Sequence, residues 1–175
     1  MSETKILFDG IIPSDPVSFI DGWMQDGAHY YPMLIQFEDT DAGGIVYHAN
    51  YLSFAERGRS GWLRLIGISQ SRELADNKVG FVVKRANLNY LRPAKLGDEV
   101  IVETRLKHLG KARIIADQTI RRAEKLEKDQ DGHIFANVEV EIVMVNETGR
   151  PIRFAPDLLE KMTSGSQSYV KSKRR

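Results

Sequence analysis

The residues whose types and spacing could carry chemistry gather between positions 37 and 51, in the segment FEDTDAGGIVYHANY. Two carboxylates, Asp39 and Asp41, precede the pair Gly43-Gly44, and a long helical pattern starts soon afterwards. Because a helix start offers unpaired N–H donors and partial positive charge, a carboxylate held beside it could face a carbonyl polarised by those donors. Glycines let the backbone approach a ligand closely. The segment fits acyl transfer to water, and it also fits an ordinary solvated turn.

Other chemistries fit the sequence poorly. A calcium loop starting at Asp39 would need an oxygen ligand at its fifth position and Glu at its twelfth, where Gly43 and Asn50 stand. An Asp-x-Asp phosphoryl-transfer site would follow a buried parallel strand in an alternating α/β chain, and that alternation is missing. The sequence contains neither G-x-S-x-G nor G-x-G-x-x-G. With no cysteine and four scattered histidines, no metal site is expected.

Composition narrows the class of protein further. The chain has 175 residues, a length that favours a single domain with extensions. Its net charge of +1 gives no reason to expect a nucleic-acid partner, since phosphate binding needs a clustered cationic excess. No apolar run reaches the roughly 18 residues of a membrane span, and the first residues lack the features of a signal peptide. These properties predict a soluble, cytoplasmic globular protein.

Two elements must position the loop. A strand is expected at Met33–Phe37, where apolar residues alternate, and the dipeptide Asp26-Gly27 favours a hairpin between Phe19–Gln25 and Ala28–Phe37. After the loop, apolar residues from Leu52 to Ile66 recur at helical spacing and predict a long helix. This arrangement places the carboxylates between the end of a strand and the start of the helix.

The rest of the chain predicts a curved sheet around that helix. Gly58 and Gly61 inside the helix indicate a close approach of the sheet, since each costs about 1 kcal/mol relative to Ala. A short helix is expected from Ser69 to Asn77 and another from Pro156. Four strands with period two follow the long helix, at Val82–Tyr90, Val100–Leu106, Ile114–Ile120 and Ile134–Met144, with a solvated hairpin tip at Glu124–Asp131. Short turns require antiparallel pairing, and exposed sheet edges favour a homo-oligomer.

The loop motif resembles that of a known family. The pattern Asp39-x-Asp41-x-x-Gly44-x-Val46-x-x-x-x-Tyr51-x-x-x-x-Glu56-x-Gly58-Arg59 is similar to the signature of hotdog-fold acyl-CoA thioesterases of the 4-hydroxybenzoyl-CoA thioesterase type, in particular the branch of Tol-Pal-associated thioesterases. A second block, Phe81-Val82-Val83-Lys84 followed by Tyr90-x-x-Pro93-Ala94-x-x-Gly97-Asp98, resembles the first strand after the family's helix and its turn. The resemblance spans about residues 33–145.

The resemblance implies an α+β hotdog fold, a five-stranded antiparallel sheet wrapped round one long helix, paired into dimers or tetramers with sites between subunits. It divides the chain into an N-terminal extension at 1–30, a thioesterase domain at 31–162 and a disordered basic tail at 163–175. Gly58 and Lys84 depart from the family, which usually has alanine and often arginine there.

The resemblance also implies roles for individual residues. Asp41 would be the catalytic carboxylate, as nucleophile or as general base for water, and the backbone N–H of His48 would polarise the thioester carbonyl. Asp39 is expected to stabilise the loop, and Glu56 to pair with Arg59. Four further positions are expected to bind substrate, namely Gly44, Val46, Tyr47 and Asn50, of which Tyr47 and Asn50 line the pocket or cap the helix. Lys111 either contacts the coenzyme A phosphates or is an ordinary solvated lysine. Coenzyme A is part of the substrate, so no separate cofactor is needed.

The expected function is therefore hydrolysis of an acyl-CoA to a carboxylic acid and free thiol, with an acyl carrier protein as a second conceivable carrier. A non-catalytic module that binds acyl-CoA or acyl carrier protein is the alternative. What discriminates them is whether Asp41 is reachable in a pocket or locked by loop hydrogen bonds. A hotdog dehydratase fits less well, because that chemistry uses a catalytic histidine in a different motif.

Overall fold

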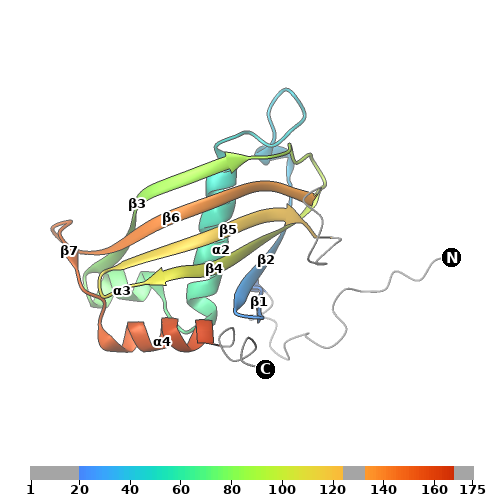
Figure 1. Ribbon diagram of the computed structural model, residues 1–175. Helices are drawn as coiled ribbons and strands as arrows, with labels where there is room; N and C mark the ends of the chain where they lie inside the picture. Colours follow the sequence, from blue (N-terminus) through green and yellow to red (C-terminus); the bar gives the residue numbers. More distant parts are fainter. Residues whose placement is uncertain (1–19, 124–132, 168–175) are drawn as a thin grey trace.

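The computed structural model describes residues 20–123 and 133–167, and Figure 1 shows a curved antiparallel sheet lying across one long helix. The sheet order is β1-β2-β4-β5-β6-β3, and β7 pairs with β6. The strands are β1 (Trp23–Gln25), β2 (Ala28–Leu34), β3 (Val79–Tyr90), β4 (Glu99–Leu109), β5 (Arg113–Arg122), β6 (Ile134–Asn146) and β7 (Pro151–Ile152). The helices are the 3-10 turn η1 (Phe37–Asp39), α2 (Asn50–Leu65), α3 (Gln70–Asp76) and α4 (Pro156–Gln167). The predicted α+β class and the five long strands are confirmed, with short β1 and β7 added.

The core lies between α2 and the inner face of the sheet. Phe54 and Ala55 of α2 are fully buried, as are inward residues of β4, β5 and β6. A side chain at Gly58 would meet Val102 of β4, since a Cβ there would lie 2.8 Å from the Val102 Cγ1. At Gly61 a Cβ would lie 3.1 Å from the backbone oxygen of Asp21. The predicted close approach at both glycines is confirmed, and it allows α2 to pack closely against the sheet.

The predicted strand at Met33–Phe37 is wrong at its end. Strand β2 ends at Leu34, and Phe37–Asp39 form the 3-10 turn η1. The Asp39 carboxylate accepts a hydrogen bond from the Gln36 N–H at 2.8 Å, and the Asp39 N–H donates to the Gln36 carbonyl at 3.1 Å. This reciprocal pair closes a turn instead of continuing a ladder, and it leaves the Phe37 ring 82% exposed.

The chain ends also differ from the predicted division. The hairpin around Asp26-Gly27 is confirmed by the pairing of β1 with β2, so residues 23–30 belong to the sheet and not to a separate extension. Helix α4 runs to Gln167, so the domain does not end at residue 162 and residues 163–167 are helical. Residues 1–19, 124–132 and 168–175 lie outside the described residues, and the whole predicted hairpin tip at Glu124–Asp131 falls among them. No helix of the described segments is long and apolar enough to cross a membrane.

A buried histidine sits in the β2–α2 interface. His29 of β2 is fully buried, and its Nε2 is hydrogen-bonded to the backbone carbonyl of Asp21. Burial lowers the pKa of His29 to about 4, against the raising effects of that hydrogen bond and of the Asp21 carboxylate. The same carboxylate pairs with Arg64 of α2 at 2.7 Å. The Nδ1 atom of His29 has no hydrogen-bond partner within the described residues, so the imidazole ring of His29 is neutral in the folded state.

This histidine should make stability depend on pH. In the unfolded chain its pKa is near 6.5, so acid protonates the unfolded state first and favours unfolding. The free energy of unfolding is therefore expected to fall by about 1.3 kcal/mol between pH 7.5 and 5.5. Urea unfolding of the wild type and of His29→Gln at both pH values measures this, with the exposed His108→Gln as control. An equal pH dependence in wild type and His29→Gln would contradict the assignment.

Candidate active site

The loop between η1 and α2 is held in one shape by backbone contacts. Thr40 and Val46 form an isolated bridge, and Ile45 bridges to Lys95 in the turn between β3 and β4. The Val46 N–H donates to the Ala94 carbonyl at 2.9 Å, which ties the loop to the same turn. Because the loop is braced from both sides, its side chains are presented on a fixed backbone.

The two aspartates of the motif have different surroundings. Asp39 is 4% exposed, and besides the turn contact its backbone carbonyl accepts hydrogen bonds from the Tyr47 N–H and from the Asn50 side chain, both at 2.9 Å. It stabilises the loop, as predicted. Asp41 is exposed, and only its Oδ1 is engaged, by the Gly43 N–H at 2.8 Å. Its second carboxylate oxygen accepts no hydrogen bond from the described residues, so the Asp41 carboxylate is accessible from solvent and is not locked by loop hydrogen bonds.

The partial positive charge at the start of α2 is not balanced by a capping side chain or by an acidic residue in the first turn. Its N-cap residue Ala49 makes no side-chain capping hydrogen bond, and the first turn contains no acidic residue. Just before it, the His48 N–H has no acceptor among the described residues, while the His48 carbonyl accepts from the Tyr90 hydroxyl at 2.9 Å. Free donors and the helix dipole at this point favour a developing negative charge.

The predicted substrate-binding residues divide into two groups. Gly44 has a φ of +74°, a conformation that suits glycine and lets its N–H donate to the Asp41 carbonyl at 3.0 Å. Tyr47 is half exposed, with its ring 4.4 Å from that of His48. Val46, by contrast, is 3% exposed and packs in the core, and the Asn50 amide is bonded to Asp39. Gly44 and Tyr47 thus border the open side of the loop, whereas Val46 and Asn50 hold it in place.

Lys111 lies far from this loop in the same chain. The loop side of the sheet is marked by Asp98, whose carbonyl accepts from the Ile35 N–H at 3.0 Å just before β4 begins. Strand β4 has 11 residues and is therefore roughly 35 Å long, and Lys111 follows its other end. Figure 1 shows the turn between β3 and β4 and the turn between β4 and β5 at opposite ends of the sheet. The structure does not bring Lys111 together with Asp41 in one chain.

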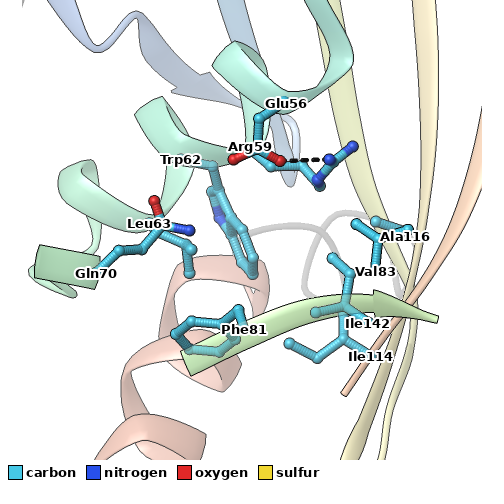
Figure 2. Close-up of a pocket in the computed structure, with 10 residues that line it drawn as sticks. All are labelled: Glu56, Arg59, Trp62, Leu63, Gln70, Phe81, Val83, Ile114, Ala116 and Ile142. Carbon is cyan, nitrogen blue, oxygen red and sulfur yellow. Dashed lines mark hydrogen bonds and ion pairs between the residues drawn. The ribbon is translucent and has the colours of Figure 1, made fainter. Parts of the chain in front are cut away.

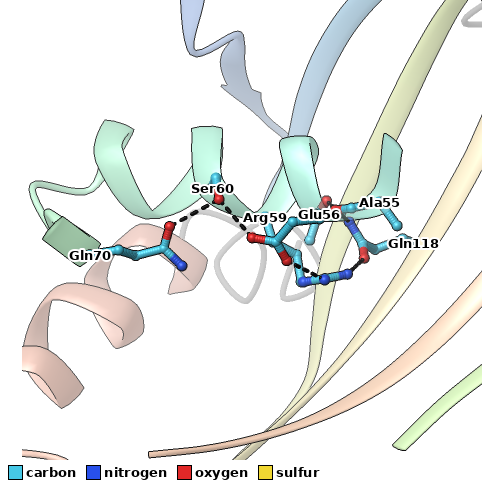
Figure 3. Close-up of polar contacts among 7 residues, drawn as sticks. Ala55, Glu56, Arg59, Ser60, Gln70 and Gln118 are labelled. Atoms are coloured by element: carbon cyan, nitrogen blue, oxygen red, sulfur yellow. Dashed lines mark hydrogen bonds and ion pairs between the residues drawn. The ribbon is translucent and has the colours of Figure 1, made fainter. Parts of the chain in front are cut away.

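A buried polar network supports the middle of α2 (Figure 3). Arg59 is 7% exposed and donates to Gln118 of β5 at 2.7 Å and to Glu56, as predicted for that pair. Gln118 in turn donates to the Ala55 carbonyl at 2.8 Å and to the Thr104 hydroxyl at 2.9 Å. The network locks α2 to the sheet and so fixes the position of the helix start.

Three residues that support the site were not found from the sequence. The Tyr51 hydroxyl accepts from the Ala94 N–H at 3.0 Å, and burial raises the pKa of Tyr51, which keeps the hydroxyl protonated. Tyr90 holds the His48 carbonyl, and the exposed Lys95 lies on the turn that pairs with the loop. These contacts join residues 40 to 50 positions apart. The family-like blocks contain Tyr51, Tyr90 and Ala94, but they assign no role to any of them.

The chain is similar to proteins of known family. The model of the thioesterase-like superfamily matches residues 35–162. The acyl-CoA thioester hydrolase YbgC of Escherichia coli O6:H1 is 34% identical over 131 residues, covering 75% of this chain and 89% of that protein. The acyl-CoA thioesterase YbgC of Haemophilus influenzae is 40% identical over 99 residues, covering 57% and 73%.

Solved structures show the same architecture. A probable thioesterase from Bartonella henselae has a TM-score of 0.59 at 34% identity, covering 73% of this chain and 98% of that one. A DHNA-CoA thioesterase from Staphylococcus aureus has a TM-score of 0.71, covering 85% and 96%; at 20% identity it is similar in fold alone.

Proposed function

The chain belongs to the thioesterase-like superfamily and has its hotdog fold, and on that premise we propose that it is an acyl-CoA thioesterase that works through Asp41. The observation that supports this most is the pairing of a reachable carboxylate with the uncapped start of α2 in one braced loop. Binding of an acyl-CoA needs no carboxylate beside the thioester, whereas hydrolysis needs a nucleophile or a base there.

The proposed reaction consumes one thioester and one water. The carbonyl oxygen would lie at the start of α2, where the His48 N–H donates to it as negative charge develops, an effect worth roughly 10²–10³ in rate for one such donor. Either the Asp41 carboxylate attacks the carbonyl carbon, expelling the thiolate and forming an anhydride that water hydrolyses, or Asp41 takes a proton from an attacking water. Both routes end in one carboxylate and one thiol.

The function is tested by product analysis. When the purified chain consumes an acyl-CoA, thiol and carboxylate are expected in equal amounts. Thiol release without matching carboxylate would mean that the acyl group passes to an acceptor other than water, and the hydrolase proposal would fail. Including an acyl carrier protein thioester beside the acyl-CoA identifies the carrier.

A second copy of the chain is part of the proposal. Strand β3 ends the sheet order, and its residues Val82, Val83 and Tyr90 are each more than 40% exposed, an apolar edge suited to pairing with another β3. Since Lys111 cannot reach Asp41 of its own chain, it would serve the site of a partner, where its ammonium group would contact the coenzyme A phosphates.

Mixed oligomers test this shared site. Asp41→Asn and Lys111→Glu are co-expressed, so that a mixed oligomer contains a site with the Asp41 of one chain and the Lys111 of the other. Activity per site above the average of the two pure variants is expected. If each chain used its own Lys111, no site of the mixed oligomer would be intact, and the activity would not exceed that average.

A further inference from the structure

We propose that a pocket between α2 and β3 binds the far end of the acyl group and selects a straight aliphatic chain over an aromatic ring; this rests on the proposed thioesterase function. Figure 2 shows the pocket, with the Trp62 ring of α2 above Phe81 of β3. The apolar lining comprises Trp62, Phe81, Val83, Ile114, Ala116 and Ile142. None of the comparisons assigns a ligand to this pocket in the present chain.

The pocket is built as an apolar slot with a neutralised rim. Ile114 and Ala116 at its floor are almost fully buried, whereas the Glu56 side chain at its rim is 51% exposed, so the slot opens to the surface beside α2. Glu56 and Arg59 lie at the rim, where they form an ion pair with each other. Arg59 also donates a hydrogen bond to Gln118. Gln70, the remaining polar residue of the lining, is neutral and its Oε1 accepts a hydrogen bond from Ser60, so the described lining offers no unpaired charge to a charged ligand. Its occupant should be apolar.

The slot and the start of α2 are related by one face of that helix. Leu52, Glu56, Arg59 and Leu63 follow one another at helical spacing and share one face of α2. Leu52, near the helix start, is 40% exposed, and Glu56 is exposed as well. At 1.5 Å per residue, the slot residues from Glu56 to Leu63 lie about 9 to 20 Å from the start of α2 at Asn50. An acyl chain whose carbonyl lies at the helix start would run along this face and enter the slot with its end.

The size of the slot decides between chain and ring. Its volume is about 40 Å³. A benzene ring occupies an engineered protein cavity of about 150 Å³, whereas a cavity of some 10–15 Å³ already holds one water. The slot thus admits the thin end of a polymethylene chain and excludes an aromatic ring. Because a longer chain buries more apolar surface against Trp62 and Phe81, the slot favours longer straight chains.

Filling the slot tests the proposal by activity. For the wild type, kcat/KM should rise with the length of a straight acyl chain and should be at least tenfold lower for 4-hydroxybenzoyl-CoA than for a long-chain acyl-CoA. Ala116→Phe, which fills the floor, should lower the long-chain to short-chain ratio of kcat/KM at least tenfold. Ile115→Phe, on the opposite face of β5, is the control and should keep the wild-type ratio. A preference for the aromatic substrate, or an unchanged ratio in Ala116→Phe, would overturn the proposal while leaving the thioesterase function standing.

A binding measurement keeps the test valid if Ala116→Phe does not fold. The chain has two tryptophans, so Trp23→Phe leaves Trp62 as the single fluorescent reporter in the slot. Non-hydrolysable coenzyme A thioethers with bromine on the last carbon quench tryptophan only on close contact. Quenching should be absent for short chains and strong for long ones. Quenching that does not depend on chain length, or none with a bound long chain, would place the acyl end elsewhere. Because no hydrolysis is involved, this result is independent of the catalytic role of Asp41.

Discussion

Asp41→Asn is expected to lower kcat for acyl-CoA hydrolysis by roughly 10³-fold, because an amide can neither attack a thioester nor take a proton from water. The melting temperature should stay unchanged. Asp41 is exposed, and its Oδ1 accepts one hydrogen bond from the Gly43 N–H, a bond that an asparagine oxygen can also accept. The variant therefore removes the charge and leaves the loop intact.

A neighbouring carboxylate provides the matched control for this variant. Glu38 is exposed and lies three residues before Asp41, and Glu38→Gln should leave both kcat and the melting temperature as in the wild type. Steady-state kinetics with a thiol-reactive dye and thermal unfolding measure the two quantities. If Asp41→Asn kept more than a tenth of the wild-type kcat, Asp41 would be neither nucleophile nor base, and the catalytic assignment would be withdrawn.

Arg59→Met is expected to destabilise the protein by about 2 kcal/mol. The methionine keeps most of the aliphatic stem, so the change mainly removes the guanidinium group that donates to Gln118 at 2.7 Å. Gln118 is 1% exposed, and its Oε1 would be left in the core without that donor, which is costly because water cannot replace it. The Glu56 side chain is half exposed and would be hydrated instead.

The control for Arg59→Met lies on the same helix. Arg57 is exposed, and its guanidinium lies 5.9 Å from the centroid of the Phe54 ring. Arg57→Met should change the free energy of unfolding by less than about 0.5 kcal/mol, as is usual at the surface. Urea unfolding gives both values. Equal effects of the two variants would show that the buried network contributes nothing beyond general loss of charge.

Local patterns predicted the parts of the fold that depend on local chemistry. The helix over α2 followed from its apolar spacing, and Gly58 and Gly61 correctly indicated the close approach of the sheet. The family resemblance, and not local chemistry, implied a catalytic role for Asp41 and left Asp39 to stabilise the loop, a structural role that fits the burial of Asp39. The error at Phe37 has a local cause too. Alternation continued through Phe37, but the Asp39 carboxylate closed a turn with Gln36 and ended the strand three residues earlier.

Features that depend on distant contacts could not be predicted in the same way. The support of His48 by Tyr90 and the pairing of Ile45 with Lys95 join segments that sequence spacing does not relate. The separation of Lys111 from Asp41 follows from the full length of β4, which a turn motif does not reveal. Helix α4 extends to Gln167 through a Ser-rich stretch of weak helix formers, where packing overrides propensity: Leu158 and Met162 are buried, and a Cβ at Gly165 would meet Ile66.

The most direct test of the central claim is the rate at which the purified wild-type chain releases thiol from a long-chain acyl-CoA, with binding of the non-hydrolysable thioether measured alongside. The account predicts saturable thiol release far above spontaneous hydrolysis, inhibited competitively by the thioether. Binding of the thioether without any thiol release from acyl-CoA or from an acyl carrier protein thioester would contradict it, and the chain would be a binding module whose Asp41 has no catalytic role.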